Sequence, residues 1–116
     1  MHEYGICAGI VEAVEDRAHG RKVARVRVRI GTLRRVVEPA FQQAFTASAM
    51  GTVAEDAKFE IVVMPARARC RSCNKEMESQ DSIPACPHCG GVDLEFTGGE
   101  ELMLESLEYA ATGGGG

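Results

Sequence analysis

The sequence predicts an α+β fold in which a three-stranded sheet is flanked by two helices and carries an inserted four-cysteine module. Two segments repeat apolar residues at helical spacing, and three segments alternate polar and apolar residues as strands do. Two CxxC pairs stand between the second and third of those strands. Because the strands on both sides of the cysteines fit one sheet, we expect the module to be an insertion into it.

The first predicted helix covers residues 4–18. Its apolar face follows the i, i+3, i+4, i+7 pattern and consists of Cys7, Ile10, Val11, Val14 and Ala18. Gly20 follows the last turn, where glycine commonly ends a helix. Cys7 lies on the apolar face, so we expect it to pack as a small hydrophobic residue.

The pattern changes to a period of two at Lys22, which predicts the first strand. One side of this strand carries Ala24, Val26, Val28 and Ile30, and the other side carries arginines. The second helix begins at Glu38-Pro39, since proline suits the first helical turn and a carboxylate is favoured there. Residues 58–64 and 102–109 alternate again and form the second and third strands.

This order divides the chain into two domains and a tail. Residues 1–69 and 98–110 form the α+β domain, and residues 70–97 form the cysteine module. Residues 111–116 end in four glycines, and we expect them to be disordered. A length of 116 residues suits one compact domain with a small appended module.

Composition and charge argue against a membrane protein and against a nucleic-acid-binding one. No apolar run reaches the roughly 18 residues of a membrane span, and residues 1–20 lack the pattern of a signal peptide. We therefore expect a cytoplasmic protein. Residues 70–116 hold 2 basic and 9 acidic side chains, and such a surface repels a phosphate backbone.

The two CxxC pairs are Cys70 with Cys73 and Cys86 with Cys89, a spacing typical of structural zinc sites. Four thiolates complete the tetrahedral coordination of Zn²⁺ and leave no position for a reactive water. The site therefore predicts folding of the module and no enzymatic activity. Two disulfides, a redox-active CxxC and an iron site of the rubredoxin type are the alternatives.

The amino terminus, Met1-His2-Glu3, offers a second set of donors. The α-amine of Met1, the amide nitrogens of His2 and Glu3 and the His2 imidazole can surround one ion in a plane. Planar nitrogen coordination suits Ni(II) or Cu(II) better than Zn(II). The alternative interpretation is a polar start to the first helix.

Several motifs occur together in a fixed order: Met1-His2-Glu3, Ile30-Gly31, Val37-Glu38-Pro39 with Phe45 beyond it, the paired CxxC and CPxCG at 70–90 and Gly-Glu-Glu-Leu-Met-Leu-Glu-Ser-Leu-Glu at 99–108. This ordered set resembles the HypA/HybF family of hydrogenase maturation proteins from residue 1 to about residue 109. The resemblance implies a nickel metallochaperone that delivers Ni(II) to the large-subunit precursor of [NiFe]-hydrogenase, and in some bacteria serves urease as well.

The resemblance also implies a HypB-type GTPase as a partner and a structural zinc ion on the four cysteines. Nickel would bind at Met1, His2 and Glu3 in the α+β domain, with Glu38 as a further ligand. A zinc-ribbon adaptor or transcription accessory protein without a nickel function is the alternative. Both a monomer and a strand-exchanged homodimer fit the sequence, because the last strand follows a separable insert.

Overall fold

The computed structural model describes residues 2–111, so Met1 and residues 112–116 of the predicted tail lie outside the described residues. The elements in chain order are α1 (His2–Ala18), β1 (Val23–Gly31), the 3₁₀ helix η1 (Thr32–Arg34), α2 (Glu38–Ala49), β2 (Lys58–Met64), β3 (Ala66–Cys70), β4 (Glu76–Ser79), β5 (Leu94–Gly98) and β6 (Leu102–Tyr109).

The chain forms two compact units. The helical unit comprises the residues up to Val28, then Val37–Ile61, and the residues from Leu104 onward. The cysteine unit comprises Arg29–Val36 and Val62–Met103. The cysteine unit is therefore larger than the segment 70–97, because the strand before Cys70 belongs to its sheet and the residues after β1 bond to it.

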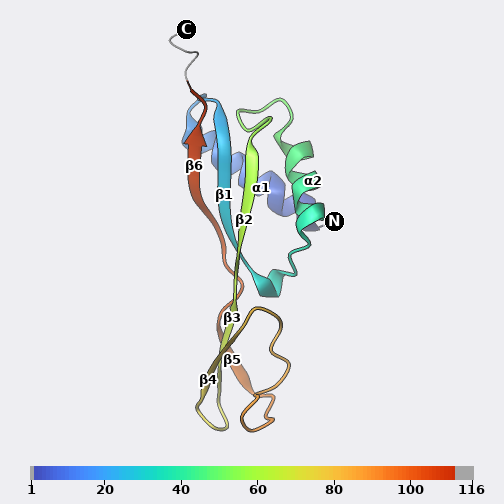
Figure 1. Ribbon diagram of the computed structural model, residues 1–116, viewed down its shortest axis with the longest axis vertical. Helices are drawn as coiled ribbons and strands as arrows, with labels where there is room; N and C mark the ends of the chain where they lie inside the picture. The colour runs from blue at the N-terminus through green and yellow to red at the C-terminus, as the bar shows by residue number, and fades with distance from the viewer. Residues whose placement is uncertain (1, 112–116) are drawn as a thin grey trace. The chain divides into compact units, whose positions relative to one another are not determined.

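The helical unit contains the predicted three-stranded sheet, in the order β2-β1-β6, together with both predicted helices. Figure 1 shows β1 and β2 running side by side in the same direction, β6 running in the opposite direction, and α1 behind the sheet. α2 connects the two parallel strands and lies beside β2, as a crossover helix does. The predicted fold class is confirmed.

The core of this unit is formed by the apolar faces that the sequence pattern indicates. All five residues of the predicted face of α1 are buried, and α2 contributes Phe41, Ala44, Phe45 and Ala49. Phe45 stacks on Phe59 of β2 with ring centroids 4.2 Å apart. One assignment was wrong: Ala24 is exposed and Val23 is buried instead. The Val23 N–H donates to the Val53 carbonyl oxygen at 2.9 Å, so the connection before β2 covers the beginning of β1.

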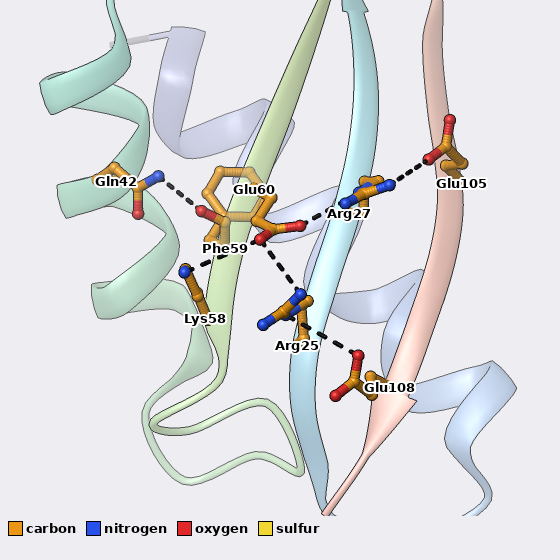
Figure 2. Close-up of polar contacts among 8 residues, drawn as sticks. All are labelled: Arg25, Arg27, Gln42, Lys58, Phe59, Glu60, Glu105 and Glu108. Atoms are coloured by element: carbon orange, nitrogen blue, oxygen red, sulfur yellow. Dashed lines mark hydrogen bonds and ion pairs between the residues drawn. The ribbon is translucent and has the colours of Figure 1, made fainter.

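The other face of the sheet is a ladder of ion pairs, shown in Figure 2. Glu60 of β2 lies within 3.1 Å of Arg27 and 3.5 Å of Arg25, both on the central strand β1. Arg27 reaches Glu105 of β6 at 3.6 Å, and Arg25 reaches Glu108 at 4.0 Å. The carboxylates of Glu60 and Glu105 raise the pKa of Arg27 further. These side chains cross all three strands, so they favour one strand register over others.

The cysteine unit is built on a second sheet, β4-β3-β5, in which both neighbours run antiparallel to β3. Its core cluster of buried residues comprises Ala66, Ala68 and Ile83, with Leu33, Met77 and Leu94 partly buried against them. Two alanines and one isoleucine bury little apolar surface. The hydrophobic effect alone therefore gives this sheet little stability.

The segment 29–36 bonds firmly to the rest of the cysteine unit. The N–H of Leu33 donates to the Gly99 carbonyl oxygen at 2.8 Å, and the N–H of Gly31 donates to that of Glu101 at 2.8 Å. Two side chains add to these bonds: Thr32 Oγ1 donates to the Gln80 carbonyl oxygen and Arg34 Nε to that of Glu100, each at 2.7 Å.

Candidate metal centre

The four cysteines of the two CxxC pairs lie together in the cysteine unit. Their sulfur atoms all lie within 4.8 Å of one another. Two of these distances join the two arms: Cys70 Sγ is 3.6 Å from Cys89 Sγ, and Cys73 Sγ is 3.7 Å from Cys86 Sγ. Four sulfurs about 2.3 Å from a tetrahedral zinc ion would lie roughly 3.8 Å apart, so the cluster has the size that zinc requires.

Each CxxC arm is a tight turn, and the two turns repeat the same hydrogen bonds. In the first arm the N–H of Asn74 donates to the Cys70 carbonyl oxygen at 2.7 Å, and in the second the N–H of Gly90 donates to that of Cys86 at 2.8 Å. Asn74 and Gly90 both have left-handed backbones, with φ of 63° and 77°. Glycine and asparagine adopt this conformation more readily than other residues, which explains their place directly after each second cysteine.

Backbone N–H groups point at the sulfurs and favour the thiolate form that binds metals. The N–H groups of His88 and Gly91 lie 3.4 Å from the sulfurs of Cys86 and Cys89. Backbone hydrogen bonding from Cys73 lowers the pKa of Cys70 to about 7. For Cys89, the Gly91 N–H acts in the same direction, but the neighbouring Cys70 sulfur and burial outweigh it and raise the pKa to about 11.

The raised pKa of Cys89 reflects the crowding of the sulfurs. Four thiolates at these distances repel one another, so all four ionise together only around a cation. The sulfurs of the two arms lie 3.6 and 3.7 Å apart, well beyond the roughly 2.05 Å of a disulfide bond, and no cysteine is in a disulfide. The donor set, its spacing and the amide groups around it all fit a tetrahedral Zn²⁺ ion.

The fifth cysteine is part of the helical core, as the sequence indicated. Cys7 is fully buried, and its thiol donates to the Phe41 carbonyl oxygen at 3.5 Å. Burial raises the pKa of Cys7 to about 11, and the charge of Glu3 acts in the same direction. Cys7 is therefore a neutral packing residue.

The predicted amino-terminal donors begin α1. His2 Nδ1 lies 3.5 Å from Glu3 Oε2, and the His2 side chain is 54% exposed. The His2 ring makes an edge contact with Phe41 of α2, with centroids 6.1 Å apart. The third predicted donor, Met1, lies outside the described residues.

Glu38, the fourth residue suggested for this region, is the exposed first residue of α2. Among residues 2–111, the four cysteines are the one group of three or more His, Cys, Asp or Glu side chains placed to hold a metal ion.

Sequence reasoning missed two features around these sites. The first is the contact of the Phe41 ring with His2, which joins α2 to α1. The second is the pair of bonds from Thr32 and Arg34, which join two segments of the cysteine unit across 48 and 66 positions of the sequence. No local pattern indicates such pairings.

A comparison with protein-family models identifies the family of this chain. Residues 1–109 match the model described as "Hydrogenase/urease nickel incorporation, metallochaperone, hypA". The chain belongs to the HypA family. HypA proteins are maturation factors and metallochaperones, not enzymes.

Individual HypA proteins agree with this assignment. The chain is 43% identical over 111 residues to hydrogenase maturation factor HypA 2 of Bradyrhizobium diazoefficiens, covering 93% of this chain and 98% of that protein. It is also 43% identical to hydrogenase maturation factor HypA of Desulfitobacterium hafniense, covering 93% and 97%. The solution structure of the Ni metallochaperone HypA from Helicobacter pylori matches with a TM-score of 0.66 and 26% identity, covering 95% of this chain and 98% of that one.

A further structural observation concerns membranes. None of the helices within residues 2–111 is long and apolar enough to cross a bilayer.

Proposed function

We propose that this HypA-family chain carries Ni(II) to the large-subunit precursor of a [NiFe]-hydrogenase and holds a structural zinc ion on Cys70, Cys73, Cys86 and Cys89. The observation that carries the proposal is the extent of the family match, residues 1–109, which includes both the amino-terminal His2-Glu3 pair and the four cysteines. The chain thus offers two donor sets of different chemistry, nitrogen at one end and sulfur in a separate unit.

The geometry of α1 suits a nickel ion bound at Met1, His2 and Glu3. The first four N–H groups of a helix have no acceptor within the helix. Because α1 begins at His2, the amides of His2 and Glu3 are among these four, and metal binding there breaks no helical hydrogen bond. The exposed imidazole of His2 supplies a further nitrogen, and together with the α-amine the set fits the planar geometry of Ni(II). Glu38, the exposed first residue of α2, is a further candidate ligand from the resemblance.

Zinc serves the fold in this proposal. The cysteine unit has a core of very few apolar residues, so metal binding supplies folding free energy that the core does not. Four cysteine ligands leave zinc no open coordination position, so the ion is structural and takes no part in catalysis. We assign nickel to the domain formed by residues 1–69 and 98–110, and zinc to residues 70–97.

The proposed role defines the partners. The family description covers hydrogenase and urease, so urease maturation is a second destination for the same nickel. We infer that the chain works in the cytoplasm, receives or passes nickel together with a HypB-type GTPase, and releases it to the hydrogenase precursor.

Equilibrium dialysis of the wild-type chain and His2→Ala against nickel, with zinc measured in the same samples, tests this function. The substitution should abolish one nickel per chain and leave about one zinc per chain in place. His19→Ala is the matched control, because His19 is an exposed histidine at the other end of α1. Unchanged nickel binding by His2→Ala would contradict the proposed site.

A further inference from the structure

Strand β5 leaves one edge of the sheet in the cysteine unit open. The sheet order is β4-β3-β5, so β5 pairs with β3 on one side only. On an edge strand, alternate residues direct their backbone N–H and C=O groups away from the sheet. Such groups can pair with an extended segment of another polypeptide.

The register shows which residue of β5 faces outward. The N–H of Arg71 donates to the Asp93 carbonyl oxygen at 3.0 Å, and the pairing continues with Arg69 opposite Glu95 and Ala68 opposite Phe96. Hydrogen-bonded and non-hydrogen-bonded pairs alternate, so Glu95 bonds toward β3 and Phe96 bonds outward. An irregularity in the register beyond Ala68 ends this regular pairing. The free edge is therefore short and centred on Phe96.

The side chains around Phe96 form a surface suited to a partner. Phe96 is 44% exposed, although large aromatic side chains are usually buried. A hollow of about 300 Å³ lies beside it, lined by Phe96, Thr97, Gly98, Glu100 and Glu101. It combines one aromatic wall with two acidic side chains.

The charges at this edge indicate what kind of segment fits. Asp93 is paired with Arg71 at 2.8 Å, and the more distant charge of Glu95 also raises the pKa of Arg71. The Glu100 side chain lines the hollow itself. In a second copy of this chain, antiparallel pairing of two β5 edges centred on Phe96 would place Glu95 diagonally across from its own counterpart. Like charges facing each other across paired strands are destabilising. A basic segment would instead be attracted to the carboxylates at this edge.

We propose that the open edge of β5 binds an extended basic segment of a partner protein, with Phe96 pairing through its backbone and the hollow beside it receiving a lysine or arginine side chain. The proposal rests on the cysteine unit alone and does not depend on nickel binding. Backbone pairing supplies the orientation, and Glu95 and Glu100 select the charge of the partner.

Amide hydrogen exchange of the zinc-loaded full chain tests this interface. The probe is a peptide of sequence Lys-Val-Arg-Val-Lys with blocked ends, and the control peptide replaces each basic residue with glutamate. Without peptide, the Phe96 amide should exchange much faster than the Glu95 amide. The basic peptide at saturation should slow Phe96 exchange about tenfold or more, and the acidic peptide should not.

Two substitutions at one position separate the backbone from the side chain. Phe96→Ala keeps the outward N–H, whereas Phe96→Pro removes it without removing a bond to β3. The proline variant should bind the basic peptide about three to ten times more weakly than the alanine variant. Glu100→Lys should also weaken binding of the basic peptide. Because this substitution alters no backbone bond of β5, it tests the proposal even if the proline variant misfolds.

Three results would overturn the proposal. The first is equal binding of the acidic and basic peptides. The second is peptide-induced protection on β4 with none at Phe96. The third is protection of Phe96 that grows with protein concentration in the absence of peptide, because that result identifies a second copy of the chain as the occupant.

Discussion

Replacing Gly31 with alanine tests how closely the end of β1 packs in the cysteine unit. Gly31 is buried, and a Cβ atom at this position would overlap the backbone carbonyl of Gly99 and the backbone nitrogen of Glu100. Backbone atoms cannot rotate aside as a side chain can, so the strand and its neighbour must separate. Separation stretches the bonds from Gly31 to Glu101 and from Leu33 to Gly99, each 2.8 Å long.

The expected loss follows from these contacts. Two backbone hydrogen bonds contribute about 1 kcal/mol each, and overpacking adds about 1 to 3 kcal/mol, so the variant should lose about 3 to 5 kcal/mol of stability in this unit. Hydrogen exchange at the Leu33 amide reports the loss directly, because its acceptor is Gly99.

Gly9→Ala is the matched control for this experiment. Gly9 is an exposed residue within α1, and a Cβ atom there meets no heavy atom within 4 Å. Alanine should therefore stabilise the helix by up to about 1 kcal/mol. If Gly31→Ala changed the stability by less than about 0.5 kcal/mol, far below the overpacking estimate, the close approach to Gly99 would be wrong.

Two further predictions concern the cysteines. Cys73→Ser should lose zinc and make residues 62–103 sensitive to limited proteolysis while the helical unit stays resistant; uniform resistance would contradict a metal-dependent cysteine unit. Cys7 gives a pH effect, because burial raises its pKa from 9.0 to about 11. The neutral thiol is favoured in the fold, so its contribution to stability is complete below about pH 9 and is lost as the pH rises towards about 11. Over that interval the free energy of unfolding should fall more steeply with pH for the wild type than for Cys7→Ala. The same pH dependence in both chains would contradict the burial argument.

The helical unit could be predicted well because its elements carry strong patterns. β2 and β6 occupy residues 58–64 and 102–109, as alternation indicated, and α1 differs from its predicted start by two residues. Ala24 was placed on the wrong face because a small side chain gives little information about burial. The loop before β2 determines which end residue of β1 is covered, and this is a tertiary contact.

The second sheet could not be predicted from the sequence. β3 reads Ala-Arg-Ala-Arg-Cys, which lacks the β-branched and aromatic residues that favour strands. β4 has four residues and β5 has five, and their pairing depends on the turns that bring the cysteines together. The spacing of the cysteines was sufficient to predict that they gather, since each CxxC turn is local. The bonds of residues 29–36 to distant parts of the chain have no such local origin.

A nickel titration of the zinc-loaded chain, with its amino terminus either free or acetylated, tests the two-site account most directly. The free chain should bind one nickel ion and show the visible absorption of a square-planar Ni(II) complex, whereas the acetylated chain should lose both the absorption and the nickel. Zinc content should remain at about one per chain in both samples. Equal nickel binding by the two chains, or loss of zinc from the acetylated chain, would contradict the assignment of nickel to the terminal nitrogens and zinc to the four sulfurs.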